Sequence, residues 1–247
     1  MVKNHIKRIN APKRWEVLRK NHAFISRPNP GRAHDLCLSL NTVIKELLKK
    51  TRTSKESKYL IKKQRVFVNG KRRYDEKFPV GFLDVVSFPD LKEDYRCLVN
   101  KKAKIFLLKI SNEDAKLKIS KVINKKQASK DETQILCSDG RSFILKKENP
   151  FLKEIKTNDS LLYTLPDQTI KQAIKLEKGT LVYLYKGKHT GLLVAVDDFK
   201  GENIIFTEDK DVFETKKAYA LAVGKDKPAI NLAENENQVK KSNHKGK

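Results

Sequence analysis

The sequence predicts a mixed α/β protein of several modules: an extended basic arm, a small α/β module, a β-rich central module and a small barrel. Three observations support this. The 247 residues are enough for a substantial core divided over two or three modules. Helical patterns are clearest over residues 35–63. Short strand patterns with glycine-bearing turns fill the second half of the chain.

The chain opens with a segment, residues 1–34, that has no sustained periodicity. Prolines and a glycine interrupt it at Pro12, Pro28, Pro30 and Gly31. Basic residues alternate there with Trp15 and Phe24. We expect an extended arm that becomes ordered on a partner. The alternative is that Trp15, Val17 and Leu18 anchor the arm to the protein itself.

Residues 35–92 predict a small α/β module. An apolar stripe indicates a helix over 35–50, formed by Leu36, Leu40, Val43, Ile44, Leu47 and Leu48. A second helix is expected from Thr53 to about Lys63, because Thr53-Ser54-Lys55-Glu56 has the form of a capping box. Asn69-Gly70 between residues 65–68 and 71–74 predicts a hairpin, and a last strand is expected over 83–88.

Residues 93–170 predict a β-rich central module. Its strand candidates are residues 103–110, 116–123, 135–137, 143–145 and 160–165. Residues 116–123 alternatively continue a helix that begins at Glu113. Residues 171–233 predict a small barrel with strands over 181–185, 192–196, 204–207 and 218–223. Residues 234–247 are polar and predict a flexible basic tail.

The basic charge is concentrated near the N-terminus. The chain has 54 Lys and Arg against 30 Asp and Glu, a net charge of +24. Residues 1–74 hold 21 basic and four acidic side chains, and the remaining residues hold 33 and 26. Such a dense basic region repels itself unless a polyanion neutralises it. The alternative, a solvated lysine-rich surface, fits the segregation less well. Within residues 45–73, 12 basic residues against two acidic ones favour the backbone phosphates of a folded RNA.

Several protein classes are excluded by what the sequence lacks. No apolar run approaches the roughly 20 residues of a membrane-spanning helix, and residues 1–8 have no apolar segment typical of a secretory signal. Three cysteines far apart (Cys37, Cys97, Cys137) predict buried, reduced thiols. We therefore expect a soluble cytoplasmic protein without a membrane partner.

Catalytic motifs are also absent. The sequence contains no G-x-G-x-x-G, G-x-x-x-x-G-K-[ST], H-E-x-x-H or G-x-S-x-G. The five histidines lack the spacing of metal ligands. We expect no enzyme activity, no cofactor, no metal and no small-molecule substrate.

A series of motifs occurs in a characteristic order along the chain. They are His5–Lys13 with Trp15, Arg27–Gly31, Val68–Lys71, Phe78–Val86, Ala115–Lys118, Asp139–Arg141, Lys186–Gly191 and Val223–Pro228. Together they resemble the S-four-e family of small-subunit ribosomal proteins, and the form Arg-Pro-Asn-Pro-Gly is similar to that of archaeal members.

The resemblance implies a structural constituent of the small ribosomal subunit that binds its rRNA beside neighbouring ribosomal proteins in the cytoplasm. It also implies an S-four-like RNA-binding module at residues 35–92 and a KOW-containing, SH3-like barrel whose turn is Lys186–Gly191. The chain departs from the family at Arg32 and Ala33, where relatives tend to carry proline and glycine, and at Leu192–Val194, where a further glycine is usual.

Eighteen residues are candidate RNA contacts. In the arm, Trp15 stacks on a base or sugar or else packs on protein, and the phosphate contacts are Lys7, Arg8, Lys13, Arg14, Arg19, Lys20 and Arg27. In the α/β module they are Lys55, Lys58, Lys62, Arg65, Lys71, Arg72 and Arg73. At the barrel turn they are Lys186, Lys188 and His189, with a plain surface loop as the alternative.

Two other functions remain open from the sequence. One is an RNA-modifying enzyme that docks through an S-four-like module. The other is a transcription or translation factor of the KOW type that associates with RNA only transiently.

Overall fold

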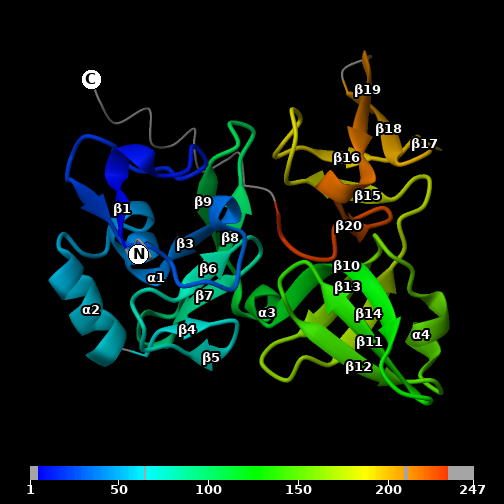
Figure 1. Cartoon of the computed structure of the whole chain (residues 1–247), viewed down its shortest axis with the longest axis horizontal. Coiled ribbons are helices and arrows are strands. Elements are labelled where there is room, and N and C mark those ends of the chain that lie inside the picture. The colour runs from blue at the N-terminus through cyan, green and yellow to red at the C-terminus, as the bar shows by residue number, and fades with distance from the viewer. Residues whose placement is uncertain (1–4, 64, 209–210, 233–247) are drawn as a thin grey trace.

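The computed structural model describes residues 5–63, 65–208 and 211–232. The predicted flexible tail, residues 234–247, lies outside these residues. Strands predominate, and they gather in three regions: an N-terminal region up to residue 110, a central region over 111–174 and a C-terminal region from 175 (Figure 1). In the described part of the chain, no helix is long and apolar enough to cross a membrane.

The described part of the arm packs against the N-terminal region. Its elements are β1 (Ile6–Lys7), η1 (Arg8–Asn10), β2 (Phe24–Ile25) and η2 (His34–Leu36), and β1 pairs with β2. Trp15 is 0% exposed and belongs to the same core as Ala11 and Ile25. The Ile105 amide donates to the Arg14 carbonyl oxygen at 2.8 Å. The expectation of an arm that needs a partner to become ordered is therefore corrected in favour of anchoring through Trp15, because the indole supplies a large apolar surface.

Trp15 provides a direct test of this packing, because it is the single tryptophan of the chain. We expect the free protein to fluoresce at short wavelength and to resist quenching by acrylamide. Replacing Trp15 by alanine should cost about 3–5 kcal/mol of unfolding free energy, as for other large-to-small core substitutions. Long-wavelength emission that acrylamide quenches readily would contradict the packed arm.

The first predicted helix starts later than expected. Residues of β3 (Cys37–Ser39) pair with β6 (Pro79–Gly81), and only then do α1 (Leu40–Thr42) and the π-helical turn η3 (Val43–Leu47) follow. Ser39 caps α1, because its hydroxyl accepts a hydrogen bond from the Thr42 amide at 3.3 Å. The predicted helix over 35–50 is thus wrong at its N-terminal end, where pairing with β6 outweighs the helical pattern.

The second helix and the hairpin are confirmed. Helix α2 (Ser54–Lys63) begins directly after Thr53. The Thr53 hydroxyl accepts a hydrogen bond from the Glu56 amide at 3.2 Å, and the Glu56 carboxylate accepts one from the Thr53 amide, as in a capping box. Asn69 and Gly70 have φ of 52° and 73°, as a two-residue type I′ turn requires.

The first sheet has the order β5-β4-β7-β8-β9. Its strands are β4 (Phe67–Val68), β5 (Lys71–Arg72), β7 (Val85–Phe88), β8 (Glu93–Val99) and β9 (Ile105–Ile110). The expected module boundary at residue 92 falls inside this sheet, because η4 (Pro89–Leu91) makes a tight turn and β8 pairs directly with β7. The α/β module therefore continues through β9.

The central region holds the second sheet, with the order β12-β11-β10-β13-β14. Its elements are α3 (Asn112–Ala115), β10 (Leu117–Gln127), β11 (Glu132–Cys137), β12 (Ser142–Lys146), α4 (Pro150–Glu154), β13 (Ser160–Thr164) and β14 (Ile170–Ile174). The strand alternative for residues 116–123 is confirmed, and the helix alternative is wrong, because α3 ends at Ala115 and β10 begins at Leu117.

The C-terminal region holds two three-stranded sheets. Their orders are β16-β15-β20 and β17-β18-β19. The elements are β15 (Leu181–Leu184), β16 (Leu193–Ala195), β17 (Asp198–Lys200), β18 (Asn203–Glu208), β19 (Asp211–Lys216), η5 (Lys217–Tyr219) and β20 (Ala220–Gly224). Val182, Ile204 and Phe206 join the two sheets in one buried cluster.

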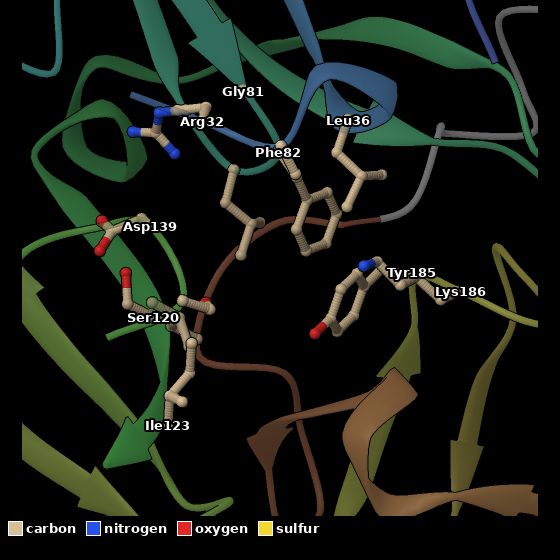
Figure 2. A pocket seen from close by; sticks show the side chains of 13 residues that line it. Arg32, Leu36, Gly81, Phe82, Ser120, Ile123, Asp139, Tyr185 and Lys186 are labelled. Carbon is tan, nitrogen blue, oxygen red and sulfur yellow. The ribbon is translucent and has the colours of Figure 1, made fainter. Parts of the chain in front are cut away.

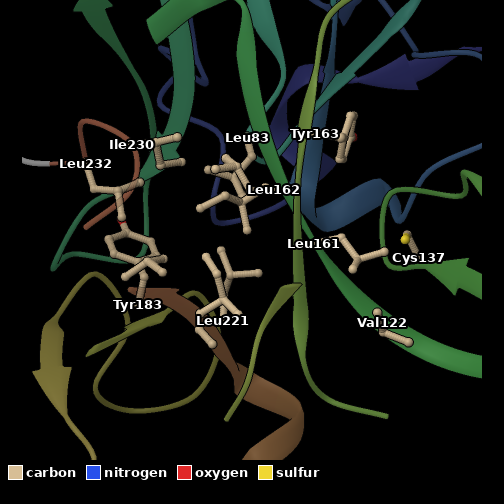
Figure 3. Close-up of a cluster of buried hydrophobic side chains, with 14 of the residues drawn as sticks. Leu83, Val122, Cys137, Leu161, Leu162, Tyr163, Tyr183, Leu221, Ile230 and Leu232 are labelled. Atoms are coloured by element: carbon tan, nitrogen blue, oxygen red, sulfur yellow. The ribbon is translucent and has the colours of Figure 1, made fainter. Parts of the chain in front are cut away.

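One larger core connects the three regions. Figure 3 shows Leu83 of the N-terminal region facing Leu162 of β13, with Tyr183, Leu221 and Ile230 of the C-terminal region close by. All are at most 7% exposed. The regions are thus held together by apolar burial, the main stabilising contribution in a protein interior.

Three buried cations add polar links between the regions. Arg96 of β8 donates to the Asn231 carbonyl oxygen at 3.0 Å and to two carbonyls of the central region, those of Asp114 and Leu117. Lys118 of β10 binds Asp84 at 2.7 Å and Asp139 at 2.9 Å. Lys121 donates to carbonyl oxygens of Lys217 and Ala220. The two ammonium groups and both terminal nitrogens of the Arg96 guanidinium thus have the acceptors that burial of charge demands.

Lys121 should make stability depend on pH. Burial lowers the pKa of its ammonium from 10.5 to about 8. Between these values the folded protein has lost a proton that the unfolded chain still holds, so the free energy of unfolding rises with pH. In urea unfolding across this range, we expect wild-type stability to rise relative to that of a Lys121→Met variant. A difference that does not change with pH would contradict the assignment.

The three cysteines are buried free thiols, as predicted. Burial raises the pKa of Cys37 to about 11. A thiol that stays protonated at neutral pH is a poor nucleophile.

Candidate nucleic-acid interface

The first basic surface is formed by α2 and the β4–β5 hairpin. Ser57 and Ile61 are buried on one side of α2, and the lysines of this helix are exposed to solvent. The exposed basic residues of this surface are Lys55, Lys58, Lys62, Lys63, Arg65 and Lys71. Within the described chain, the one ion pair formed by this set joins Lys58 Nζ to Glu76 Oε1 at 3.2 Å. The surface therefore has a large excess of positive charge.

Arg72 and Arg73 lie beside this surface but are half-buried. The Arg72 guanidinium stacks 4.6 Å from the centre of the Tyr74 ring, and that of Arg73 stacks 4.2 Å from the centre of Phe78. Stacking fixes the planes of both guanidinium groups and leaves their edges as donors. Because both side chains also pack, the exposed lysines are the cleaner probes of phosphate binding.

Two exposed tyrosines lie on the same surface and were not among the predicted contacts. Tyr59 of α2 is 66% exposed, and Tyr74 after β5 is 59% exposed. Exposed rings beside basic side chains are typical stacking platforms for unpaired bases. The sequence signal was their position directly after Lys58 and Arg73.

The arm residues divide into exposed and structural groups. Lys7, Lys13 and Lys20 are exposed, and Arg27 is half-buried. Arg19 donates to three carbonyl oxygens of the arm, those of Ile9, Ala11 and Pro12, and is also half-buried. Arg19 therefore stabilises the turn of the arm over residues 9–12.

Arg8 and Trp15 are corrections to the predicted RNA contacts. Arg8 is 2% exposed, and its Nη2 lies 2.5 Å from Glu46 Oε1, while its Nη1 donates to the Leu18 carbonyl oxygen at 2.7 Å. Trp15 is fully buried, with its ring 5.3 Å from that of His34. Neither side chain reaches solvent, so both stabilise the fold.

The turn Lys186–Gly191 follows β15. Lys188 is exposed, whereas Lys186 and His189 are half-buried. The His189 ring packs 4.5 Å from Phe213 and 5.5 Å from Phe206, measured between ring centres. His189 therefore packs on the sheet β17-β18-β19, and Lys188 is the basic residue of this turn that is exposed to solvent.

A pocket of about 280 Å³ lies where the three regions meet (Figure 2). The arginine and the carboxylate that line it are already paired: Arg32 Nη2 lies 2.8 Å from Asp84, and Asp139 accepts from Lys118 and Tyr163. Burial alone would raise the pKa of the Asp139 carboxyl, but the Lys118 ammonium and the two hydrogen bonds outweigh it and hold this pKa below its ordinary value. A carboxylate held ionised in this way is a structural ion-pair partner and a weak proton acceptor.

The pairing of Arg32 explains how the chain accommodates an arginine at a position where proline or glycine was expected. Its aliphatic stem passes over Gly81, where a Cβ would meet the Arg32 Cδ.

Among the residues that the structure describes, no group of three or more His, Cys, Asp or Glu is placed to hold a metal ion.

Exposed lysines and tyrosines on α2 and beside the β4–β5 hairpin are typical of a nucleic-acid-binding protein. Comparison with known protein families shows which family the chain matches. The family described as "Ribosomal family S4e" matches residues 91–170, and the "RS4NT (NUC023) domain" matches residues 2–36.

Relatives match over almost the whole chain. The small ribosomal subunit protein eS4 of Methanocaldococcus jannaschii is 38% identical over 241 residues, which cover 93% of this chain and 98% of the relative. The protein of the same name from Methanococcus vannielii is 33% identical with the same coverage. The crystal structure of the 30S ribosomal protein S4e from Thermoplasma acidophilum superposes with a TM-score of 0.68 at 27% identity, covering 81% of this chain and all of that one.

The chain therefore belongs to the S4e family of small ribosomal subunit proteins, also named eS4. This confirms the resemblance seen in the ordered motifs. These relatives give no support to an RNA-modifying enzyme or a transient factor.

Proposed function

We propose that this protein is a structural constituent of the small ribosomal subunit, where it works in the cytoplasm and binds small-subunit rRNA beside neighbouring ribosomal proteins. Membership of the eS4 family over almost the full length of the chain carries this proposal. Its role is that of a scaffold: cationic side chains reduce phosphate repulsion where rRNA helices meet, and counterions are released on binding.

The first basic surface supports the rRNA-binding role. Its six exposed basic residues supply positive charges that can bind phosphates. Tyr59 and Tyr74 add ring faces on which unpaired bases stack. The surface thus suits a folded RNA that presents both a phosphate backbone and unstacked bases. Arg72 and Arg73 are proposed to position the hairpin and donate to phosphate from their edges.

The finer division of the fold is also a proposal. Residues 1–34 form the arm, and the S-four-like module starts at residue 35 and extends through β9. The C-terminal region is proposed to be a KOW-type, SH3-like barrel, because two three-stranded sheets enclose one apolar cluster and a basic glycine-bearing turn follows β15.

Salt dependence of rRNA binding tests the proposal. The purified protein should bind small-subunit rRNA with a log–log slope against salt of about −5 if the six exposed basic residues of the first surface each contact a phosphate. An unrelated RNA of the same length is the control and should bind more weakly. Equal affinity for both RNAs, or affinity that salt leaves unchanged, would contradict the proposed role.

A further inference from the structure

Three turns that are far apart in the sequence converge at one place. They are residues 11–15 of the arm, residues 99–105 between β8 and β9, and residues 185–191 after β15. Together they contain seven Lys and Arg and no Asp or Glu: Lys13, Arg14, Lys101, Lys102, Lys104, Lys186 and Lys188. We call this site the lysine junction.

Two hydrogen bonds to carbonyl oxygens of the arm hold the arm turn against the β8–β9 turn. The Lys104 ammonium donates to the Lys13 carbonyl oxygen at 2.5 Å, and the Ile105 amide donates to the Arg14 carbonyl oxygen at 2.8 Å. These bonds fix the backbone that carries Lys13 beside the one that carries Lys101 and Lys102.

The third turn is packed equally closely. A Cβ placed on Gly191 would meet the Asn100 carbonyl carbon and the Lys101 amide nitrogen well inside van der Waals distance, so only glycine fits there. Arg14 Nη1 donates to the Tyr185 carbonyl oxygen at 2.9 Å, and the Tyr183 hydroxyl donates to the Val99 carbonyl oxygen. In Figure 1 the β8–β9 turn accordingly lies beside the C-terminal region.

The junction leaves several cations without a counter-charge. Lys13, Lys101, Lys102 and Lys188 are exposed, and Lys186 is half-buried at the edge of the pocket in Figure 2. Among the described residues, none of these five ammonium groups has an ion-pair partner within 4.0 Å. Like charges held together by the fold repel one another, and this repulsion is relieved when an anion binds.

We propose that the lysine junction is a second RNA-binding site, separate from the first basic surface, that takes the phosphates of an RNA helix. This inference rests on the proposed function and adds Lys101 and Lys102 as contacts. RNA is favoured over an acidic protein partner because the exposed cations are all lysines, which bind phosphate as point charges. The exposed positions of the three turns also carry none of the large apolar or aromatic anchors on which protein interfaces depend.

Because three turns, two from the N-terminal region and one from the C-terminal region, supply the site, RNA bound there also holds the arm against the β8–β9 turn and joins the C-terminal region to the N-terminal region. A ligand that binds only the folded arrangement stabilises it by mass action. Binding of rRNA should therefore raise the thermal stability of the contacts between these regions.

The test compares three triple variants of the full chain. One is Lys101→Gln with Lys102→Gln and Lys188→Gln, the second is Lys55→Gln with Lys62→Gln and Lys71→Gln, and the control is Lys126→Gln with Lys130→Gln and Lys171→Gln. All nine lysines are exposed, so folding should be retained. We expect the junction variant to bind small-subunit rRNA roughly 10- to 100-fold more weakly, with a salt slope smaller by about 3. Hydroxyl-radical footprinting should show lost protection at nucleotides different from those lost with the first-surface variant.

The possible outcomes separate the inference from the function it rests on. If the junction variant binds like wild type while the first-surface variant is weakened, the junction is no RNA site and the proposed function stands. If both bind like wild type, both site assignments are overturned. If the wild-type protein itself does not prefer small-subunit rRNA to an unrelated RNA, the proposed function fails. If the junction variant binds naked rRNA normally but loses affinity for assembled subunits, the partner is an acidic protein and the RNA assignment is overturned.

A variant that keeps every charge gives a second readout. Gly191→Ala pushes the third turn away from Asn100 and Lys101. It should weaken rRNA binding in the wild-type background but add little in the junction variant, because the site is already lost. Full additivity of the two effects would contradict a shared site.

Discussion

Replacing Asp84 by alanine should lower the free energy of unfolding by about 3–5 kcal/mol, as expected when one partner of a buried ion pair is removed. Asp84 is 0% exposed and accepts hydrogen bonds from Lys118 at 2.7 Å and Arg32 at 2.8 Å. Lys118 is itself 1% exposed, and without Asp84 it retains only Asp139. The variant therefore leaves a buried charge incompletely compensated.

A matched exposed pair is the control for this prediction. Lys178 and Asp198 are also 2.7 Å apart, but both side chains are more than half exposed. Asp198→Ala should cost far less than Asp84→Ala in the same urea titration, because solvent screens exposed pairs. Adding Lys118→Met to Asp84→Ala should recover part of the loss. Equal, small costs for Asp84→Ala and Asp198→Ala would show that the Asp84 network contributes little.

The ion pairs of Asp84 should also make the free energy of unfolding depend on pH in acid. Burial alone would raise the pKa of Asp84, but the Arg32 and Lys118 charges outweigh it and hold this pKa below its ordinary value of 3.8. The stabilisation is therefore complete above the ordinary pKa and is lost as the pH falls through the lower, folded value. The stability difference between wild type and Asp84→Ala should accordingly shrink in acid.

The second large effect concerns RNA. Replacing Lys55, Lys62 and Lys71 by glutamine should weaken binding to small-subunit rRNA roughly 10- to 100-fold and reduce the salt slope by about 3, one for each lost phosphate contact. These side chains are exposed, so the loss should leave urea unfolding unchanged. The measurement is a binding titration at several salt concentrations.

The control for this prediction is an equal loss of charge elsewhere. Lys126, Lys130 and Lys171 are exposed on the central region, where the excess of positive charge is smaller. Replacing them by glutamine should change affinity only slightly. If both triple variants lose the same affinity, net charge alone governs binding and the first basic surface has no special role.

Local signals predicted the elements of the first basic surface correctly. The capping box at Thr53 and the Asn69-Gly70 turn involve contacts within a few residues, so their energetics are contained in short stretches of sequence. The exposed lysines of α2 follow from the same periodicity that buries Ile61.

Features that depend on distant residues were predicted less well. Strand β8 is half polar and lacks alternation, and it exists because β7 and β9 pair with its two edges. Arg8 has the sequence environment of a phosphate contact, but Glu46, 38 residues away, neutralises it. The lysine junction joins turns separated by up to 171 residues, as the bond from Arg14 to Tyr185 shows, and no local pattern contains that contact.

Co-sedimentation shows directly whether this protein is a structural constituent of the small ribosomal subunit. A structural constituent is held by many simultaneous contacts to folded rRNA, so it should remain with the small subunit through a moderate-salt wash on a sucrose gradient. We expect stoichiometric recovery of this protein in the small-subunit peak after the wash, and none in the large-subunit peak. Release into the top fractions at moderate salt, with the subunit intact, would contradict it.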